Sequence, residues 1–264
     1  MPSSRDRALL IVELLVPEVR GLPMSDIADR LGIPRTATHR LLADLKDMGY
    51  VKQDADTARY FLTVRLAALG LAYLAATGIT DMAQPLLDDL AKETGELVRL
   101  AVSDGTRLVW VAKAQGARTG LRLDADSGAE AYLPASATGL AWLAAMTDEK
   151  ALQWVAAQGM EQAKQHGPGA PRTIVELLER TQQTRERGYA MVVDAYEPGT
   201  SAIAALVCQG QGGEPVGTVS VAGPSARMTP ARMEAMGPLL LACARALDLA
   251  VVAARLRRAL APPG

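Results

Sequence analysis

The strongest constraint on the fold comes from residues 22–62, where two short helix-forming segments, a tight break and a hairpin pattern follow one another. In MSDIADRL the apolar residues recur at helical spacing, and Gly32 follows as a helix stop. We expect Ser25 to cap the first turn of this helix. Pro34 suits the first turn of a second helix, which we expect to run to Met48. Two short helices with so brief a break between them predict a helix-turn-helix.

The second of these helices has two different sides. On a helical wheel, at about 100° per residue, one side is apolar and the other carries cations and hydrogen-bonding groups. The apolar side consists of Ala37, Leu41, Leu45 and Met48. The opposite side consists of Thr36, His39, Arg40 and Ala43, flanked by Arg35 and Lys46. Such a face suits the major groove of DNA, where arginine reads guanine and hydroxyl or imidazole groups reach bases or phosphates.

A short hairpin is predicted directly after this helix. The sequence YVKQDADTARYFL contains two β-prone runs around an Asp-Ala-Asp-Thr turn, and it carries Lys52 and Arg59. With an amphipathic helix over residues 5–16, these elements predict a winged helix-turn-helix domain at residues 1–62. A solvated basic helix face is the alternative, but the added hairpin favours DNA binding. We expect DNA contacts from Ser25, Arg35, Thr36, Thr38, His39, Arg40, Lys46, Arg59 and Tyr60.

The rest of the chain predicts a linker helix and a second domain. Residues 63–78 form a helical pattern whose apolar residues spread over more than one face, so this helix needs partners. Over residues 79–264, helical patterns alternate with strand pairs around the turns SDGT and GQGG, which indicates an α+β fold. The expected helices cover residues 136–146, 148–158 and 173–188 and begin again at Thr229 and Pro230, and the expected strands cover residues 96–102, 107–114, 201–209 and 215–223.

Composition excludes several classes of function. With 264 residues, 49% of them hydrophobic, the chain can bury the cores of two domains. The formal net charge of −1 excludes a uniformly basic nucleic-acid coat, so a DNA-binding surface must be local. The only histidines are His39 and His166, and Cys208 and Cys243 lie in apolar runs, so neither a catalytic histidine pair nor a metal site is indicated. No apolar run approaches about 18 residues and no signal pattern opens the chain. We therefore expect a cytoplasmic protein without cofactor, metal or membrane partner.

Four segments resemble one family of bacterial regulators. SDIADRLGIPRTATHRLLADLKDMGYV is similar to the DNA-binding half of the IclR-type transcriptional regulators. MAQPLLDDLAKETGELVRLAV, GYAMVVDAYEPGTSAIAALV and GTVSVAGPSARMTP resemble segments of the effector-binding half, in the same order. The resemblance implies a ligand-responsive regulator that binds double-stranded operator DNA and controls a catabolic or transport operon. It also implies a linker helix that helps pair subunits into a homodimer or a dimer of dimers. Residues 79–264 would then form a GAF- or PAS-like effector-binding and oligomerisation domain with an antiparallel sheet flanked by helices.

The resemblance further implies a site for a small organic acid, between the helix SATGLAWLA, the loop DAYEPGTSAIAA and the strand TVSVAG. Amides at a helix N-terminus favour anions, so Ala137, Thr138 and Gly139 are expected to hold a carboxylate. Trp110 and Trp142 form an aromatic wall in this interpretation and are core residues in the simpler one. The cations within reach, each of them otherwise a surface residue, are Arg99, Arg118 and Arg122. The implied effector-binding residues are Trp110, Ala137, Thr138, Gly139, Trp142, Val192, Asp194, Ser201, Ala202, Ile203, Ser220 and Ala222.

This sequence departs from the family pattern toward lower polarity. Val192 and Val193 stand where many members carry an acidic pair, and Ala202 stands where a cysteine is frequent. Ala222 replaces a second serine, and Ser136 replaces a frequent histidine. If these positions line the pocket, the ligand has an aromatic or alicyclic body. Two alternatives stay open, namely a DNA-binding protein without ligand response and an enzyme that uses the C-terminal pocket.

Overall fold

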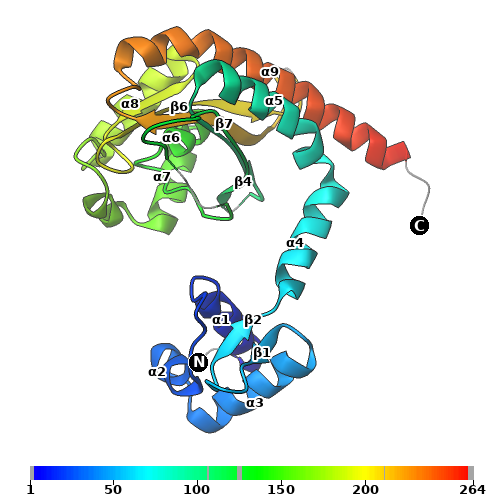
Figure 1. Ribbon diagram of the computed structural model, residues 1–264. Helices are drawn as coiled ribbons and strands as arrows, with labels where there is room; N and C mark the ends of the chain where they lie inside the picture. Colours follow the sequence, from blue (N-terminus) through cyan, green and yellow to red (C-terminus); the bar gives the residue numbers. More distant parts are fainter. Residues whose placement is uncertain (1–2, 106, 124–126, 211, 261–264) are drawn as a thin grey trace. The chain divides into compact units, whose positions relative to one another are not determined.

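The computed structural model describes residues 3–105, 107–123, 127–210 and 212–260 (Figure 1). The chain divides between Ala76 and Thr77 into two compact units. The described part of the N-terminal unit contains α1 (Ser4–Leu15), α2 (Met24–Leu31), α3 (Arg35–Asp47), β1 (Val51–Gln53), β2 (Tyr60–Leu62) and α4 (Val64–Thr77).

The N-terminal unit has the predicted winged helix-turn-helix fold. Gly32 adopts the left-handed conformation, with a φ of 62°, that ends α2 and turns the chain toward α3. β1 and β2 pair antiparallel, with Val51 opposite Leu62, and form the wing. The core between α1, α2, α3 and the wing includes Ile11, Leu15, Ile27, Leu41, Leu42, Leu45, Val51 and Tyr60.

Two details of this unit differ from the sequence expectation. Pro23 occupies the cap position of α2, so Ser25 is not the N-cap; its half-buried hydroxyl donates to Asp26 Oδ1 at 3.2 Å. Met48 is 57% exposed and does not belong to the apolar side of α3. Leu42 takes an inner place instead, because α3 packs against α1, α2 and β1 and therefore buries a broad stripe.

The linker helix α4 has a mostly apolar surface. Its sequence, VRLAALGLAYLAAT, contains one charged residue, Arg65, and within the described chain none of its residues is buried. Leu69, Leu71 and Tyr73 are 49%, 68% and 72% exposed. The pattern that predicted apolar residues on more than one face of this helix is confirmed.

In the described part of the C-terminal unit, five strands form one antiparallel sheet in the order β4-β3-β7-β6-β5. α5 and α9 cover one face of this sheet, and α6, α7 and α8 lie on the other side (Figure 1). An antiparallel sheet flanked by helices confirms the expected α+β class and is consistent with a GAF- or PAS-like domain. The elements are α5 (Ile79–Thr94), β3 (Leu97–Ser103), β4 (Leu108–Gln115), α6 (Ala137–Ala144), α7 (Asp148–Gln158), a 3-10 helix (Met160–Gln165), α8 (Ile174–Arg187), β5 (Ala190–Val193), β6 (Thr200–Cys208), β7 (Pro215–Pro224) and α9 (Pro230–Leu260).

Alternate residues of the strands face two different layers. On β7, Val219 and Val221 belong to the core under α5 and α9, whereas Ser220 faces the α6 side. The register places Arg99 of β3 and Ala204 of β6 directly beside Ser220. Because neighbouring strands keep their side chains in phase, these three residues share the α6 face of the sheet.

The final helix α9 is long and apolar. An 18-residue window within its stretch Pro230–Ala253 has a mean hydropathy of 1.7, so by length and composition alone this helix is apolar enough to cross a membrane. Met233, Leu240 and Leu247 in this stretch are buried in the core, as in a core helix of a globular domain. The expectation that no apolar run approaches the spanning length is corrected here, because scattered charges interrupt the run without lowering its mean hydropathy much.

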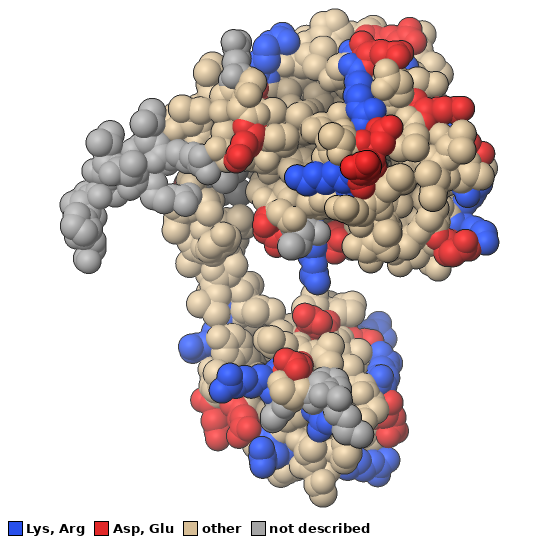
Figure 2. Space-filling view, turned by 180° about the vertical axis from the view of Figure 1, so that it is seen from behind, with Lys and Arg blue, Asp and Glu red and all other residues tan. Residues whose placement is uncertain are grey.

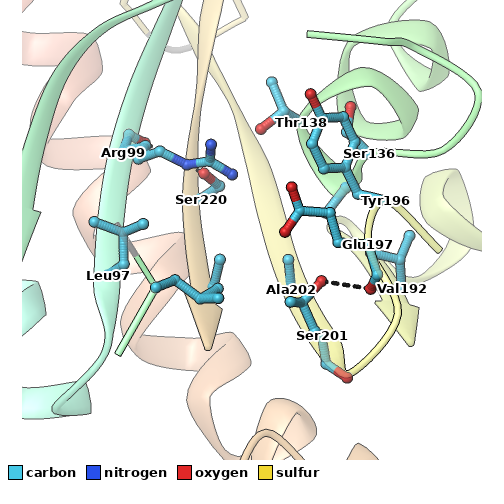
Figure 3. Close-up of a pocket in the computed structure, with 14 residues that line it drawn as sticks. Leu97, Arg99, Ser136, Thr138, Val192, Tyr196, Glu197, Ser201, Ala202 and Ser220 are labelled. Atoms are coloured by element: carbon cyan, nitrogen blue, oxygen red, sulfur yellow. Dashed lines mark hydrogen bonds between the residues drawn. The ribbon is translucent and has the colours of Figure 1, made fainter. Parts of the chain in front are cut away.

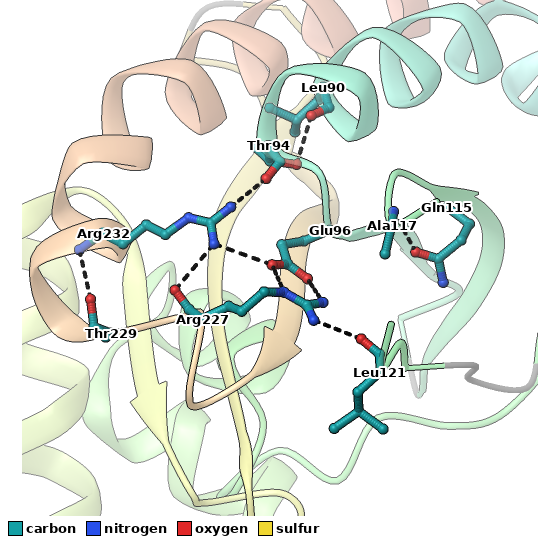
Figure 4. Close-up of polar contacts among 9 residues, drawn as sticks. All are labelled: Leu90, Thr94, Glu96, Gln115, Ala117, Leu121, Arg227, Thr229 and Arg232. Atoms are coloured by element: carbon teal, nitrogen blue, oxygen red, sulfur yellow. Dashed lines mark hydrogen bonds and ion pairs between the residues drawn. The ribbon is translucent and has the colours of Figure 1, made fainter. Parts of the chain in front are cut away.

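A buried carboxylate joins several segments of the C-terminal unit (Figure 4). The side chain of Glu96, between α5 and β3, is 2% exposed and accepts two hydrogen bonds of 2.8 Å from the Arg227 guanidinium. Arg232 of α9 lies 3.4 Å from the same carboxylate. Arg227 also donates to the carbonyl of Leu121, and Arg232 donates to that of Thr94. The cluster therefore ties the end of α5 and the start of α9 to the loop after β4.

Replacing Glu96 with Gln should lower the free energy of unfolding of the C-terminal unit by about 2–3 kcal/mol, because two arginines lose their buried counterion. Urea unfolding followed by tryptophan fluorescence measures this change, since all tryptophans of the chain lie in this unit. Glu161→Gln is the matched control: its ion pair with Lys164 is exposed, so we expect no measurable change in the free energy of unfolding. Equal effects of the two substitutions would contradict the role given to Glu96.

Candidate functional site

The outer face of α3 carries exposed cations and hydrogen-bonding groups. Within the described chain, the side chains of Arg40 and Lys46 form no hydrogen bond or ion pair, so both are free to meet a phosphate or a base edge. Lys52 on the wing is also exposed. Positive and negative side chains are interspersed over the face of this unit seen in Figure 2, in keeping with the small net charge. The predicted contacts that are exposed on α3 are Arg35, Thr36, His39, Arg40 and Lys46.

Other predicted DNA contacts are engaged inside the unit. Thr38 is fully buried, and its hydroxyl donates to the carbonyl of Pro34 at 3.2 Å. Tyr60 is 7% exposed and packs in the core. Arg59 donates from Nε and Nη2 to the carbonyl of Gly21, at 3.1 and 2.9 Å, and so fastens the base of the wing. Thr38 and Tyr60 are therefore corrected to core residues, and Arg59 to a residue that holds the wing.

The C-terminal unit contains a cavity of about 90 Å³ between the sheet and the start of α6 (Figure 3). Short apolar side chains form part of its wall, and hydroxyl and charged groups form the rest. The residues that line it are Leu97, Arg99, Leu123, Ser136, Ala137, Thr138, Val192, Tyr196, Glu197, Thr200, Ser201, Ala202, Ser220 and Ala222. The predicted effector-binding residues among them, brought together from α6, β5, β6 and β7, are Ala137, Thr138, Val192, Ser201, Ala202, Ser220 and Ala222.

The helix α6 presents its N-terminus to this cavity. Ser136 caps the helix, because its Oγ accepts from the Gly139 amide at 3.0 Å and donates to the carbonyl of Tyr132 at 2.8 Å. The amides of Ala137 and Thr138 precede the first hydrogen bonds of the helix and have no partner within it. The Gly139 amide is used by the cap, so the expected carboxylate site is reduced to its first two residues.

Further predicted effector-binding residues lie outside the cavity wall. Ile203 is in the core under α5 and α9, because side chains alternate along β6. Trp142 is buried and packs edge-on against Trp154, with 5.6 Å between the ring centroids. Trp110 is buried behind the wall, and its Nε1 donates to Thr138 Oγ1 at 3.4 Å. Both tryptophans predicted as an aromatic wall are core residues in the structure.

Asp194 shapes the loop beside the cavity and does not line it. Its backbone has a left-handed φ of 49°. Its Oδ1 accepts from the Gly199 amide at 2.8 Å and from the Ser225 hydroxyl at 2.7 Å. These bonds hold the turn from which Tyr196 and Glu197 reach the cavity.

Arg99 supplies the positive charge of the cavity. Its guanidinium lies over the Trp110 ring, 3.9 Å from the centroid. Burial lowers the pKa of Arg99 to about 10, so the side chain is still charged at neutral pH. Tyr196 and Glu197 line the same cavity, and burial raises the pKa of Tyr196 (Figure 3). The other two candidate arginines are exposed and lie outside the wall.

Several lining residues were missed from the sequence. Leu97 has a usable signal, since it lies two positions before Arg99 on one strand and shares its face. Tyr196, Glu197 and Thr200 lie in or next to an irregular loop, where no periodic pattern shows which side chains turn inward. Leu123 lies in the segment after β4, whose path depends on distant contacts.

A winged helix-turn-helix followed by a domain with a partly charged cavity is the arrangement expected of a transcriptional regulator that binds DNA and responds to an effector. Residues 4–55 match the IclR helix-turn-helix domain, and residues 71–249 match the bacterial transcriptional regulator IclR C-terminal domain. The chain belongs to the IclR family of bacterial transcriptional regulators. Members of this family are regulators and not enzymes, so the enzyme alternative is excluded.

The similarity to individual relatives extends along almost the whole chain. The transcriptional repressor IclR of Escherichia coli (strain K12) is 27% identical over 94% of this chain and 89% of its own length. The HTH-type transcriptional regulator BhcR of Paracoccus denitrificans is 30% identical over 92% of this chain and 85% of its own length. The crystal structure of an IclR regulator from Alicyclobacillus acidocaldarius has a TM-score of 0.80 at 24% identity and covers 95% of this chain and 99% of that one. An IclR homologue from Microbacterium hydrocarbonoxydans, in complex with 4-hydroxybenzoate, has a TM-score of 0.78 at 20% identity and covers 95% of this chain and all of that one (100%).

Replacing Asp194 with Ala should lower the free energy of unfolding of the C-terminal unit by about 1–3 kcal/mol, because the loop loses its acceptor and alanine disfavours a left-handed backbone. Asp194→Asn is the matched variant: asparagine keeps an Oδ1 acceptor and tolerates this conformation, so we expect a loss below about 1 kcal/mol. Urea unfolding followed by tryptophan fluorescence measures both. If the two variants lose the same stability, the charge of Asp194 and not its loop geometry is what matters.

Proposed function

We propose that this chain is a cytoplasmic regulator that binds operator DNA through the outer face of α3 and responds to a small organic acid in the cavity beside α6. The observation that carries the proposal is the cavity, which combines the charged Arg99 with the first-turn amides of α6 and a short apolar wall. A DNA-binding protein without ligand response has no use for a charged group that faces a cavity, because a charge partly removed from water lowers stability. We further propose that the regulated genes form a catabolic or transport operon.

The cavity suits a compact acid with an apolar body. Val192, Ala202 and Ala222 line it, so the positions where family members are often polar carry short apolar side chains here. Val193 is exposed and outside the wall, so its replacement of an acidic residue does not change the lining. The volume of about 90 Å³ is far below the roughly 300–1,000 Å³ of pockets for drug-sized ligands, which favours a small aromatic or alicyclic acid. The 4-hydroxybenzoate bound by the Microbacterium homologue supports testing aromatic acids first.

We propose that the chain pairs through α4 into a homodimer, alone or within a dimer of dimers. The exposed Leu69, Leu71 and Tyr73 support this, because pairing would remove them from water. A homodimer presents two copies of α3 to two operator half-sites. A ligand that binds one arrangement of the paired C-terminal domains more tightly then changes operator affinity. A shift from 1:99 to 99:1 takes about 5.5 kcal/mol of differential affinity, which several subunits supply together.

Replacing Arg40 with Ala should weaken operator binding about 5- to 150-fold, because a guanidinium on a recognition helix contributes about 1–3 kcal/mol. Fluorescence anisotropy with DNA from upstream of its own gene, at one fixed salt concentration, measures the change. Arg30→Ala is the matched control: Arg30 lies on α2 and is paired with Glu18 at 2.6 Å, so we expect less than about a threefold effect. An Arg40→Ala protein that binds as tightly as the parent would show that α3 does not dock as proposed.

A thermal-shift screen against small carboxylic acids tests the response to a ligand. An acid present at 100 times its Kd should add about 2.7 kcal/mol of stability, which raises the Tm of the C-terminal unit visibly. Each acid that does so is then added to the operator-binding measurement. An acid that stabilises the protein and changes DNA affinity supports the proposal. DNA binding that no acid alters would favour the alternative without ligand response.

A further inference from the structure

Arg99 is a half-buried cation without an ion-pair partner among the described residues. Its Nε is fully buried and has no hydrogen-bond partner, and among the described residues no carboxylate lies within ion-pair distance of its guanidinium. The Trp110 ring beneath it stabilises the charge but offers no acceptor in the plane of the guanidinium. A charge that is partly removed from water without an ion-pair partner lowers stability, so an anion bound in the cavity would stabilise Arg99.

Other arginines of this unit form ion pairs with carboxylates. Arg227 is paired with Glu96 at 2.8 Å, and Arg185 is paired with Asp148 at 2.7 Å. These two arginines fasten segments of the chain to one another. Arg99 differs from them because its guanidinium borders a cavity and holds no other segment in place.

The surroundings of Arg99 show where an anion fits. In Figure 3 the guanidinium points across the cavity beside Ser220, and the Glu197 carboxylate on the other side is turned toward it. Burial lowers the pKa of Arg99, and the nearby Tyr196 and Glu197 partly offset this effect. Glu197 is itself exposed and belongs to an irregular loop, so it is able to turn toward the solvent. Glu197 therefore offsets part of the Arg99 charge but leaves the Nε–H of the guanidinium without a hydrogen-bond acceptor.

We propose that Arg99 is the receptor for the carboxylate of the ligand, and that this carboxylate takes the place that Glu197 partly fills in its absence. The inference rests on the proposed function and narrows its ligand class. The backbone amides of Ala137 and Thr138 then donate hydrogen bonds to an uncharged oxygen at the other end of the ligand. The ligand class is a monocarboxylic acid with a compact apolar body and a hydroxyl or carbonyl group away from the carboxylate.

The assignment of the two ends follows from charge. A guanidinium carries a full positive charge and binds a carboxylate with two parallel hydrogen bonds. A helix N-terminus carries the equivalent of about half a charge, spread over several amides. When both border one partly buried cavity, the carboxylate gains more from Arg99. The amides of α6 remain good donors to a hydroxyl or carbonyl oxygen.

The test compares acids with their neutral amides on the full-length protein. The probes are 4-hydroxybenzoate, 4-hydroxycyclohexanecarboxylate and lactate, each beside its primary amide, and the readouts are thermal shift and isothermal titration calorimetry. The variants are Arg99→Met, Arg99→Lys and Glu197→Gln. Glu161→Gln serves as the control for loss of one surface carboxylate on the same domain, since its side chain is exposed and remote in sequence from the cavity wall.

We expect at least one acid to bind while its amide binds at least 30-fold more weakly. Arg99→Met should weaken binding of that acid at least 30-fold, and Arg99→Lys should weaken it less, because lysine keeps the charge but not the paired donors. Glu197→Gln should tighten binding about 3- to 10-fold, because the competing carboxylate is gone. Binding of no acid, equal binding of acid and amide, or unchanged binding to Arg99→Met would each overturn the assignment.

Two further readouts separate this inference from the proposed function. Without any ligand, Arg99→Met should have a higher Tm than the parent, since a half-buried charge without an ion-pair partner among the described residues is removed. A clearly lower Tm would indicate that Arg99 stabilises the core. If an acid still changes the operator affinity of the Arg99→Met protein, the proposed ligand response is supported and the proposed role of Arg99 is wrong. If an acid binds through Arg99 and operator affinity does not change, the role of Arg99 is supported and the proposed ligand response is wrong. Glu197→Gln keeps the site testable even if Arg99→Met folds poorly.

Discussion

The alternation of side chains along β3, β6 and β7 determines how the C-terminal unit is built. These strands are covered on both faces, so every second residue must fit under α5 and α9 and the residues between them must fit under α6. The first set consists of aliphatic residues such as Val98, Ile203 and Val221. The second set mixes small and polar residues with Arg99. Small side chains on one face only leave room for a cavity without weakening the main core.

The N-terminal unit could be predicted in detail because its signals are local. Gly32 and Pro34 mark the break between α2 and α3, and the Asp-Ala-Asp-Thr turn marks the wing. Thr38 and Tyr60, which are among the expected DNA contacts, are both buried. A helical wheel gives the direction of a side chain but not the number of neighbours around the helix. α3 packs against α1, α2 and β1, so its buried stripe reaches Thr38.

The cavity could be predicted only in part, for a different reason. Ser220 and Ala222 were found through the family resemblance, and strand register explains why Arg99 lies beside Ser220. Tyr196 and Glu197 reach the wall from a loop whose turn depends on the bond between Asp194 and Ser225, 31 positions apart in the sequence. A periodic sequence pattern does not reveal such a bond, so the sequence could not predict that Tyr196 and Glu197 line the cavity.

The apolar surface of α4 affects the stability of this helix. A helix of 14 residues with no buried side chain is close to the shortest length, about 12–15 residues, at which an isolated helix persists in water. In the proposed homodimer, the surface that covers Leu69, Leu71 and Tyr73 therefore also supplies part of the free energy that keeps α4 helical. If the chain forms the proposed homodimer through α4, the helicity of this segment rises with the concentration of the protein.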